Sequence, residues 1–155
     1  MSQFPSLVAL IYSEFHPTEG PKIICQIPAD FLSPQVFDSI SEFIIPKATL
    51  CDQLVGISAQ DHKVVGYPIK IEHEKYPRNF FMFNLCFVFE KGAMFTEYKQ
   101  VIKKMALNLK AVEIESGYLS NPDTCDGLLS IIDQVFSDLN TYHECQIYIS
   151  MFLVN

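Results

Sequence analysis

The apolar and polar positions of the first thirty residues predict two paired strands. Residues 7–12 (LVALIY) form a continuous apolar run, which is typical of a strand that is covered on both faces. Residues 16–21 (HPTEGP) are dense in turn-forming types, and residues 22–27 are again mostly apolar. We expect the two apolar segments to form an antiparallel hairpin.

A helix is predicted after the hairpin. Ser33 followed by Pro34 indicates its start, because serine caps a helix and proline suits the first turn. Pro46 ends it, since proline cannot continue the hydrogen-bonding pattern. The apolar residues that recur at helical spacing between these points are Val36, Phe37, Ile40, Phe43 and Ile44.

Three further strands follow, and the last is the most apolar. Residues 54–58 are predicted to form a short strand, which a polar turn separates from a longer one. In that longer strand the residues that alternate on one side are Val65, Tyr67, Ile69 and Ile71. A polar loop, 73–79, then precedes residues 80–89. Almost all of these are apolar, which predicts a central strand covered on both faces.

Two amphipathic helices complete the pattern. The first ends at Gly117, and Asn121 with Pro122 indicates the start of the second. The apolar stripe of the first is Tyr98, Val101, Ile102, Met105, Leu109 and Val112. The stripe of the second is Leu128, Ile131, Ile132, Val135, Phe136 and Leu139. Residues 145–154 are again strand-like.

This order of elements predicts an α/β fold. The series β-β-α-β-β-β-α-α, with an extra C-terminal strand, is dominated by hairpins, so the five-stranded sheet should be mainly antiparallel. The helix over 34–44 should cover one face, and the helices around Met105 and Val135 the other, as a three-layer sandwich. We expect one domain over residues 1–155 and a natural protein that continues beyond it.

Composition excludes several classes of protein. Hydrophobic residues make up 49% of the chain and charged residues 19%, which excludes a disordered segment. The net charge of −7 leaves no basic footprint for nucleic acid. No apolar run reaches the roughly 18 residues of a membrane span, so direct membrane insertion is not expected. The five cysteines and four histidines are widely scattered, and we expect neither a metal site nor a cofactor.

Three segments resemble one protein family. Residues 12–23 (YSEFHPTEGPKI) resemble the first hairpin of nitrogen permease regulator 2-like proteins. Residues 71–79 (IEHEKYPRN) resemble the loop before their central strand, and residues 83–88 (FNLCFV) resemble that strand. The hairpin is the most specific of the three, because a turn this long rarely repeats residue for residue by chance. The similarity extends over the whole chain and is looser in the second half.

The resemblance implies a role in GTPase activation. It implies the N-terminal longin-type domain of a subunit that pairs with a nitrogen permease regulator 3-like subunit, with a third, DEP-domain-containing subunit joining them. Such a complex stimulates GTP hydrolysis by Rag GTPases in amino-acid-dependent TOR signalling. It acts from the cytoplasm, as a peripheral complex at the lysosomal or vacuolar membrane. The family members continue beyond this domain, so the activity of the isolated piece is a separate question.

Arg78 is the candidate catalytic residue. The chain has no GxxxxGK[ST] loop and no GxSxG motif, so any catalysis is supplied to another protein's nucleotide. The resemblance places Arg78 where the family's arginine finger stands, and such a finger stabilises charge on the γ-phosphoryl oxygens. Pro77 restricts the backbone beside it, Tyr76 braces the loop with its ring, and Asn79 is a turn former or strand cap. Taken alone, an arginine in a hairpin loop is usually solvated surface.

The predicted partner surface combines the 34–44 helix with the short strand over 54–58. The helix carries more large apolar residues than one narrow stripe needs, and the strand should be a sheet edge with unpaired backbone groups. The expected contact residues are Val36, Ile40, Phe43, Ile44, Leu54 and Ile57. One alternative function is a non-catalytic longin-type scaffold or adaptor in trafficking or signalling. An independent hydrolase is disfavoured, because no nucleophile–base constellation is present.

Overall fold

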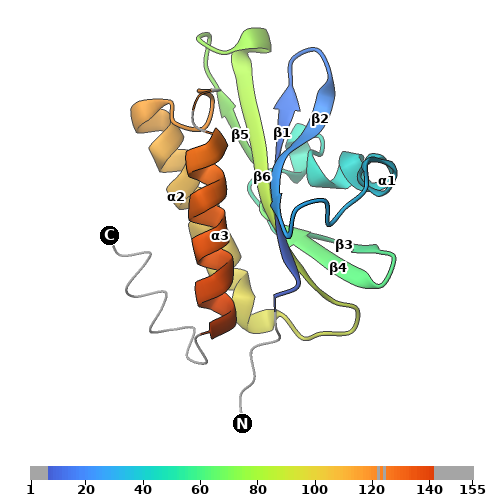
Figure 1. Ribbon diagram of the computed structural model, residues 1–155. Coiled ribbons are helices and arrows are strands. Elements are labelled where there is room, and N and C mark those ends of the chain that lie inside the picture. Colours follow the sequence, from blue (N-terminus) through green and yellow to red (C-terminus); the bar gives the residue numbers. More distant parts are fainter. Residues whose placement is uncertain (1–6, 122, 124, 142–155) are drawn as a thin grey trace.

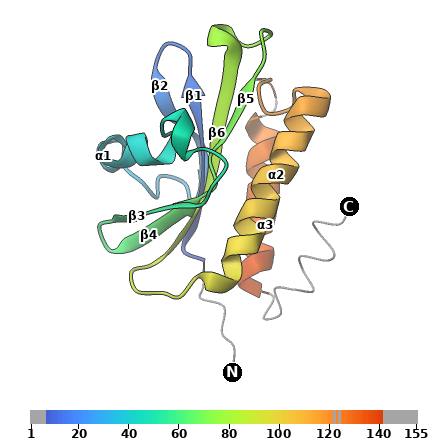
Figure 2. The same cartoon turned by 180° about the vertical axis from the view of Figure 1, so that it is seen from behind.

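The computed structural model describes residues 7–121, 123 and 125–141, and it confirms a three-layer α/β sandwich. Helix α1 (Pro34–Ile44) lies on one face of the sheet, and helices α2 (Lys99–Ser116) and α3 (Cys125–Thr141) lie together on the other (Figures 1 and 2). The strands are β1 (Ala9–His16), β2 (Gly20–Ile27), β3 (Val55–Ala59), β4 (His62–Gly66), β5 (Ile69–Glu72) and β6 (Phe80–Glu90). Short 3₁₀ turns occur at η1 (Ala48–Leu50), η2 (Pro77–Asn79) and η3 (Thr96–Tyr98).

The sheet is antiparallel throughout and has six strands, where the sequence predicted five. Its order is β2-β1-β6-β4-β3, with β5 also paired to β6. Both β4 and β5 run along the same side of β6: Val65 pairs with Phe87, and Ile69 pairs with Phe83. The single strand predicted around Val65 to Ile71 is therefore two strands, β4 and β5, which pair with β6 one after the other and are separated by a short interruption. Pro68 explains the break, because it has no N–H to donate to a ladder.

The side chain of Asn84, on β6, forms a hydrogen bond with the chain at the point where the strand is interrupted. Its side-chain oxygen accepts a hydrogen bond from the Tyr67 N–H at 3.1 Å, and its amide group donates to the Ile44 carbonyl at 2.7 Å. The side chain thus joins the interrupted strand to the last residue of α1. Gly66 lies so close that an added Cβ would be 2.3 Å from the Asn84 oxygen, so the glycine is needed for this approach.

The two faces of β6 form two separate cores, as its continuous apolar run predicted. Phe81, Phe83, Leu85 and Phe87 are buried on the side of α2 and α3. Met82 and Val88 are buried on the side of α1. Phe80 was predicted to be buried with them, but it lies at the strand end and is only half-buried. The side chains of Val65, Tyr67, Ile69 and Ile71 do share one face, despite the break between β4 and β5.

The helix boundaries follow local sequence signals closely. The Ser33 hydroxyl accepts a hydrogen bond from the Val36 N–H at 3.2 Å, as an N-cap should. Helix α2 ends at Gly117, whose φ of 67° is the left-handed conformation that favours glycine. Helix α3 begins at Cys125, a little after the predicted start. The predicted strand over 145–154 lies outside the residues that the structure describes.

Candidate functional site

Two of the three segments that resemble the family, residues 12–23 and 71–79, meet at one end of the sandwich. The β1–β2 turn and the loop from His73 to Asn79 both project beyond the same end of the sheet (Figure 1), and a hydrogen bond from Tyr76 to Glu113 joins the loop to the C-terminal part of α2. Residues of the two segments also touch, because the Arg78 guanidinium carbon lies 5.7 Å from the centre of the Phe15 ring. Two stretches that are far apart in the sequence therefore form one surface.

The loop that carries Arg78 is closed by its own backbone. The His73 N–H donates to the Asn79 carbonyl at 3.0 Å, which pins the base of the loop. Within it, the Tyr76 N–H donates to the His73 carbonyl at 3.2 Å, and the Asn79 N–H donates to the Tyr76 carbonyl at 2.9 Å. The Lys75 N–H also donates to the His73 ring at 3.0 Å. These hydrogen bonds give the loop a defined shape.

Arg78 and Asn79 both adopt left-handed backbone conformations. Their φ angles are 61° and 66°. Asparagine tolerates this region well, but for arginine it costs about 1 to 3 kcal/mol. Such strain persists only where the surrounding structure imposes it, and here the closed loop does so. The result is an arginine at the tip of a tight, preformed turn.

The Arg78 side chain is exposed and lies against an aromatic ring. Its guanidinium carbon is 5.7 Å from the centre of the Phe15 ring. Beyond this ring, the Lys70 ammonium lies 4.8 Å from the centre of Phe80. Carboxylates are close by, since Glu72 and Glu74 line the same shallow hollow as Arg78. Even so, no carboxylate of the described residues forms an ion pair with Arg78.

Tyr76 is the residue that fixes the loop to the body of the domain. It is buried, and its ring stacks on Phe81 with 5.5 Å between centroids. Its hydroxyl donates a hydrogen bond to Glu113 Oε2 at 2.6 Å. Burial, with the added effect of this carboxylate, raises the pKa of Tyr76 well above its usual range. The sequence predicted the packed ring and not the partner of the hydroxyl.

Glu113 is an acidic residue in the core that sequence reasoning missed. It lies on α2 with no exposed surface, and it accepts hydrogen bonds from the Ser120 N–H at 2.9 Å and the Ser120 hydroxyl at 2.7 Å. The stripe of α2 was predicted to end at Val112, which is instead 39% exposed. The sequence did contain a signal for this burial. Position 113 continues the helical spacing of Ile102, Ala106 and Leu109, which face the core, so it falls on the same side of α2. Because the residue at this position is charged, it was not counted among the buried positions of the helix.

The predicted partner surface is partly wrong in its residues. Ile40 and Ile44 are 5% and 2% exposed, because they face the sheet and form the core beneath α1. Val36 and Ile57 are half-buried. Phe43, at 47% exposed, and Leu54, at 36%, do face outward, and Leu50 joins them at 40%. Strand β3 ends the sheet, as predicted. The exposed large apolar residues of this region are therefore Phe43, Leu50 and Leu54, and their role as a partner surface stays a prediction.

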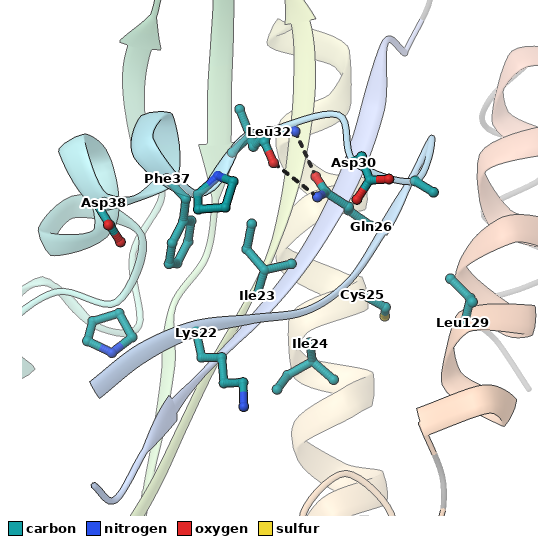
Figure 3. Close-up of a pocket in the computed structure, with 13 residues that line it drawn as sticks. Lys22, Ile23, Ile24, Cys25, Gln26, Asp30, Leu32, Phe37, Asp38 and Leu129 are labelled. Atoms are coloured by element: carbon teal, nitrogen blue, oxygen red, sulfur yellow. Dashed lines mark hydrogen bonds between the residues drawn. The ribbon is translucent and has the colours of Figure 1, made fainter. Parts of the chain in front are cut away.

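A hollow beside the other edge strand carries no comparable chemistry. It lies between β2 and α1, and the Gln26 side chain closes its rim by hydrogen bonds of 2.9 and 3.3 Å to the backbone of Leu32 (Figure 3). Its charged side chains Lys22, Asp30 and Asp38 come from different segments and do not converge (Figure 3). Nowhere in the described part of the chain do three His, Cys, Asp or Glu side chains gather to hold a metal. Nor is any described helix long and apolar enough to cross a membrane.

Fold and site together define a longin-like α/β sandwich with an exposed arginine on a loop that is closed by backbone hydrogen bonds. The protein-family model described as nitrogen permease regulator 2 matches residues 5–151. The chain belongs to the nitrogen permease regulator 2 family, which confirms the family that three sequence segments predicted.

Similar proteins are known from a fly and two yeasts. The chain is 44% identical over 132 residues to the GATOR complex protein NPRL2 of Drosophila melanogaster, covering 84% of this chain and 32% of that protein. It is 31% identical over 153 residues to the nitrogen permease regulator 2 homolog of Schizosaccharomyces pombe, covering 92% and 37%. It is 33% identical over 138 residues to nitrogen permease regulator 2 of Saccharomyces cerevisiae, covering 88% and 21%. The chain thus spans between 21% and 37% of the length of these relatives.

Proposed function

We propose that this domain belongs to a GATOR-type complex and supplies Arg78 as an arginine finger, in trans, to a Rag GTPase in amino-acid-dependent TOR signalling. The observation that carries the proposal concerns the exposure of the Arg78 side chain and its lack of a carboxylate partner. It is exposed at the tip of a closed loop, and no carboxylate of the described residues holds it. The domain itself has no nucleotide-binding loop, so it acts on the partner's GTP.

The energetics favour an arginine finger that can be released from its contact with the Phe15 ring. An exposed cation–π contact such as that with Phe15 is worth about 0.5 to 1 kcal/mol. An arginine finger accelerates hydrolysis by about 10³ to 10⁵, which corresponds to roughly 4 to 7 kcal/mol. The gain therefore exceeds the cost of release several times over. A finger held in a buried salt bridge would have had to break a much stronger interaction.

The assembly part of the proposal rests on exposed apolar residues around α1 and β3. Phe43, Leu50 and Leu54 form an exposed apolar surface beside the open edge at β3, where another strand can add. We propose that a nitrogen permease regulator 3-like subunit binds here, and that a DEP-domain-containing subunit completes the complex. The complex would act from the cytoplasm at the lysosomal or vacuolar membrane.

A non-catalytic scaffold is the second candidate, and the same apolar surface favours it. A scaffold needs the Phe43 surface and does not need Arg78. The test is single-turnover GTP hydrolysis by a Rag GTPase with the full-length protein in its complex. Arg78→Ala should lose about 10³-fold or more of the stimulation. Lys75→Ala removes an exposed cation from the same loop and should keep it. Full stimulation by Arg78→Ala would leave only the scaffold.

A further inference from the structure

We infer that Tyr76, Glu113 and Ser120 form a brace that positions Arg78, so that the junction between α2 and α3 sets the geometry of the finger. The inference rests on the proposed function and adds positioning residues to it. None of the three touches the nucleotide in this scheme. They act through the loop that carries Arg78.

The brace is a continuous chain of short contacts. Ser120 donates two hydrogen bonds to the Glu113 carboxylate, at 2.9 and 2.7 Å, and Tyr76 donates a third, at 2.6 Å. Ser120 is itself held, because its hydroxyl also lies 3.3 Å from the Gly117 carbonyl at the end of α2. The Tyr76 carbonyl then accepts from Asn79, which closes the turn around Arg78. A displacement of Glu113 would therefore be transmitted to Arg78 through two hydrogen bonds, the one from the Tyr76 hydroxyl to Glu113 and the one from the Asn79 N–H to the Tyr76 carbonyl.

Fold stability alone does not explain a carboxylate at this place. Glu113 has no exposed surface, and no cation of the described residues pairs with it. An apolar residue on the buried stripe of α2 would avoid the cost of removing a carboxylate from water. What an apolar residue cannot do is hold the Tyr76 hydroxyl in one direction. The three hydrogen bonds give Glu113 a fixed orientation, as positioning requires.

The same core supplies a matched control. Tyr12 is also a fully buried tyrosine that donates to a glutamate, with 2.8 Å between its hydroxyl and Glu14 Oε2. It lies on β1 and is not part of the Arg78 loop. Tyr12→Phe and Tyr76→Phe therefore remove the same group from the same core, and only one of them touches the brace.

The experiment measures the single-turnover rate of GTP hydrolysis against the concentration of the full-length complex. Tyr76→Phe and Glu113→Leu should lower the maximal rate by roughly ten- to a hundredfold, because a displacement of about 1 Å at a reacting group has effects of that size. The concentration for half-maximal rate should not change, because the finger contributes to the transition state rather than to binding. Glu113→Gln should restore most of the rate, since an amide can exchange hydrogen bonds with the same two hydroxyls.

Hydrogen–deuterium exchange of residues 73–80 in the same complex gives a readout that does not depend on catalysis. These amides should exchange faster in Tyr76→Phe and at the wild-type rate in Tyr12→Phe. A wild-type maximal rate in Tyr76→Phe would overturn the inference, and so would an equal loss in Tyr12→Phe. Arg78→Ala in the same assay separates the two proposals. If it is inactive while Tyr76→Phe is fully active, only the brace fails; if it is fully active, the finger itself fails.

Discussion

Replacing Asn84 by leucine should destabilise the domain by an amount that its two hydrogen bonds determine. Leucine has the same branched skeleton but cannot form hydrogen bonds, and its methyl groups cannot approach the two partners as closely as the amide group does. The Tyr67 N–H and the Ile44 carbonyl would then be buried without a partner. Each such group costs about 1 to 3 kcal/mol, and the greater apolarity of leucine returns up to about 1.5 kcal/mol. We expect a net loss of about 2 to 4 kcal/mol.

Urea unfolding measures this loss directly, with the midpoint shifting and the slope unchanged. The loss corresponds to a decrease in Tm of roughly 5 to 15 °C for a domain of this size. A variant as stable as the wild type would refute the idea that Asn84 repairs the strand break.

A double-mutant cycle with Gly66 sharpens this test. The three atoms nearest to an added Cβ at Gly66 all belong to the Asn84 side chain, at 2.3, 2.9 and 2.9 Å. Gly66→Ala should therefore cost about 1 to 3 kcal/mol in the wild type, because Asn84 must move and lose its partners. In an Asn84→Ala background the cost should fall by about 1 kcal/mol or more. Equal costs in both backgrounds would show that the two residues do not interact.

Two further predictions concern the carboxyl group near the site and the partner surface. Burial raises the pKa of Glu14 to about 7 from 4.5, with Glu113 adding to the rise and the Tyr12 hydrogen bond opposing it. The unfolded carboxyl group thus ionises first, so the unfolding free energy should fall by about 3 kcal/mol as pH rises from 4.5 to above 7. Glu14→Gln should flatten this slope in pH-dependent urea unfolding, and an unchanged slope would contradict the assignment. Phe43→Glu should abolish co-purification of the partner subunit, whereas Ile114→Glu, at an exposed site on α2, should not; retained pairing in Phe43→Glu would place the interface elsewhere.

Regular patterns in the sequence predicted much of the fold. The apolar run of β6 predicted two-sided burial, and the serine–proline pair predicted the start of α1. Alternation even placed Val65 and Ile71 on the correct face. It could not reveal the break between β4 and β5, because side-chain period continues across a segment whose backbone pairing is interrupted. That break depends on Pro68 and on a contact from Asn84, which is remote in sequence.

The candidate site was less predictable than the fold, for two physical reasons. Helix α1 is apolar over a wide stripe, and the sequence does not show which part faces the sheet, so Ile40 and Ile44 were assigned to the partner surface. Glu113 was overlooked because charged residues are usually solvated. Its burial depends on donors from Tyr76 and Ser120, which only the folded chain brings together. Arg78 was chosen through family resemblance; the structure shows that it is exposed, and its catalytic role stays a prediction.

The most direct test of the central claim is the substitution of Arg78 by lysine, with binding and catalysis measured on the same complex. Lysine keeps the positive charge and loses the planar guanidinium that contacts two phosphate oxygens at once. In single-turnover hydrolysis by a Rag GTPase, Arg78→Lys should therefore be nearly as inactive as Arg78→Ala. The affinity of the complex for the GTPase should stay at the wild-type value in both variants, because the loss lies in the transition state. Stimulation at the wild-type rate by either variant would contradict the arginine finger.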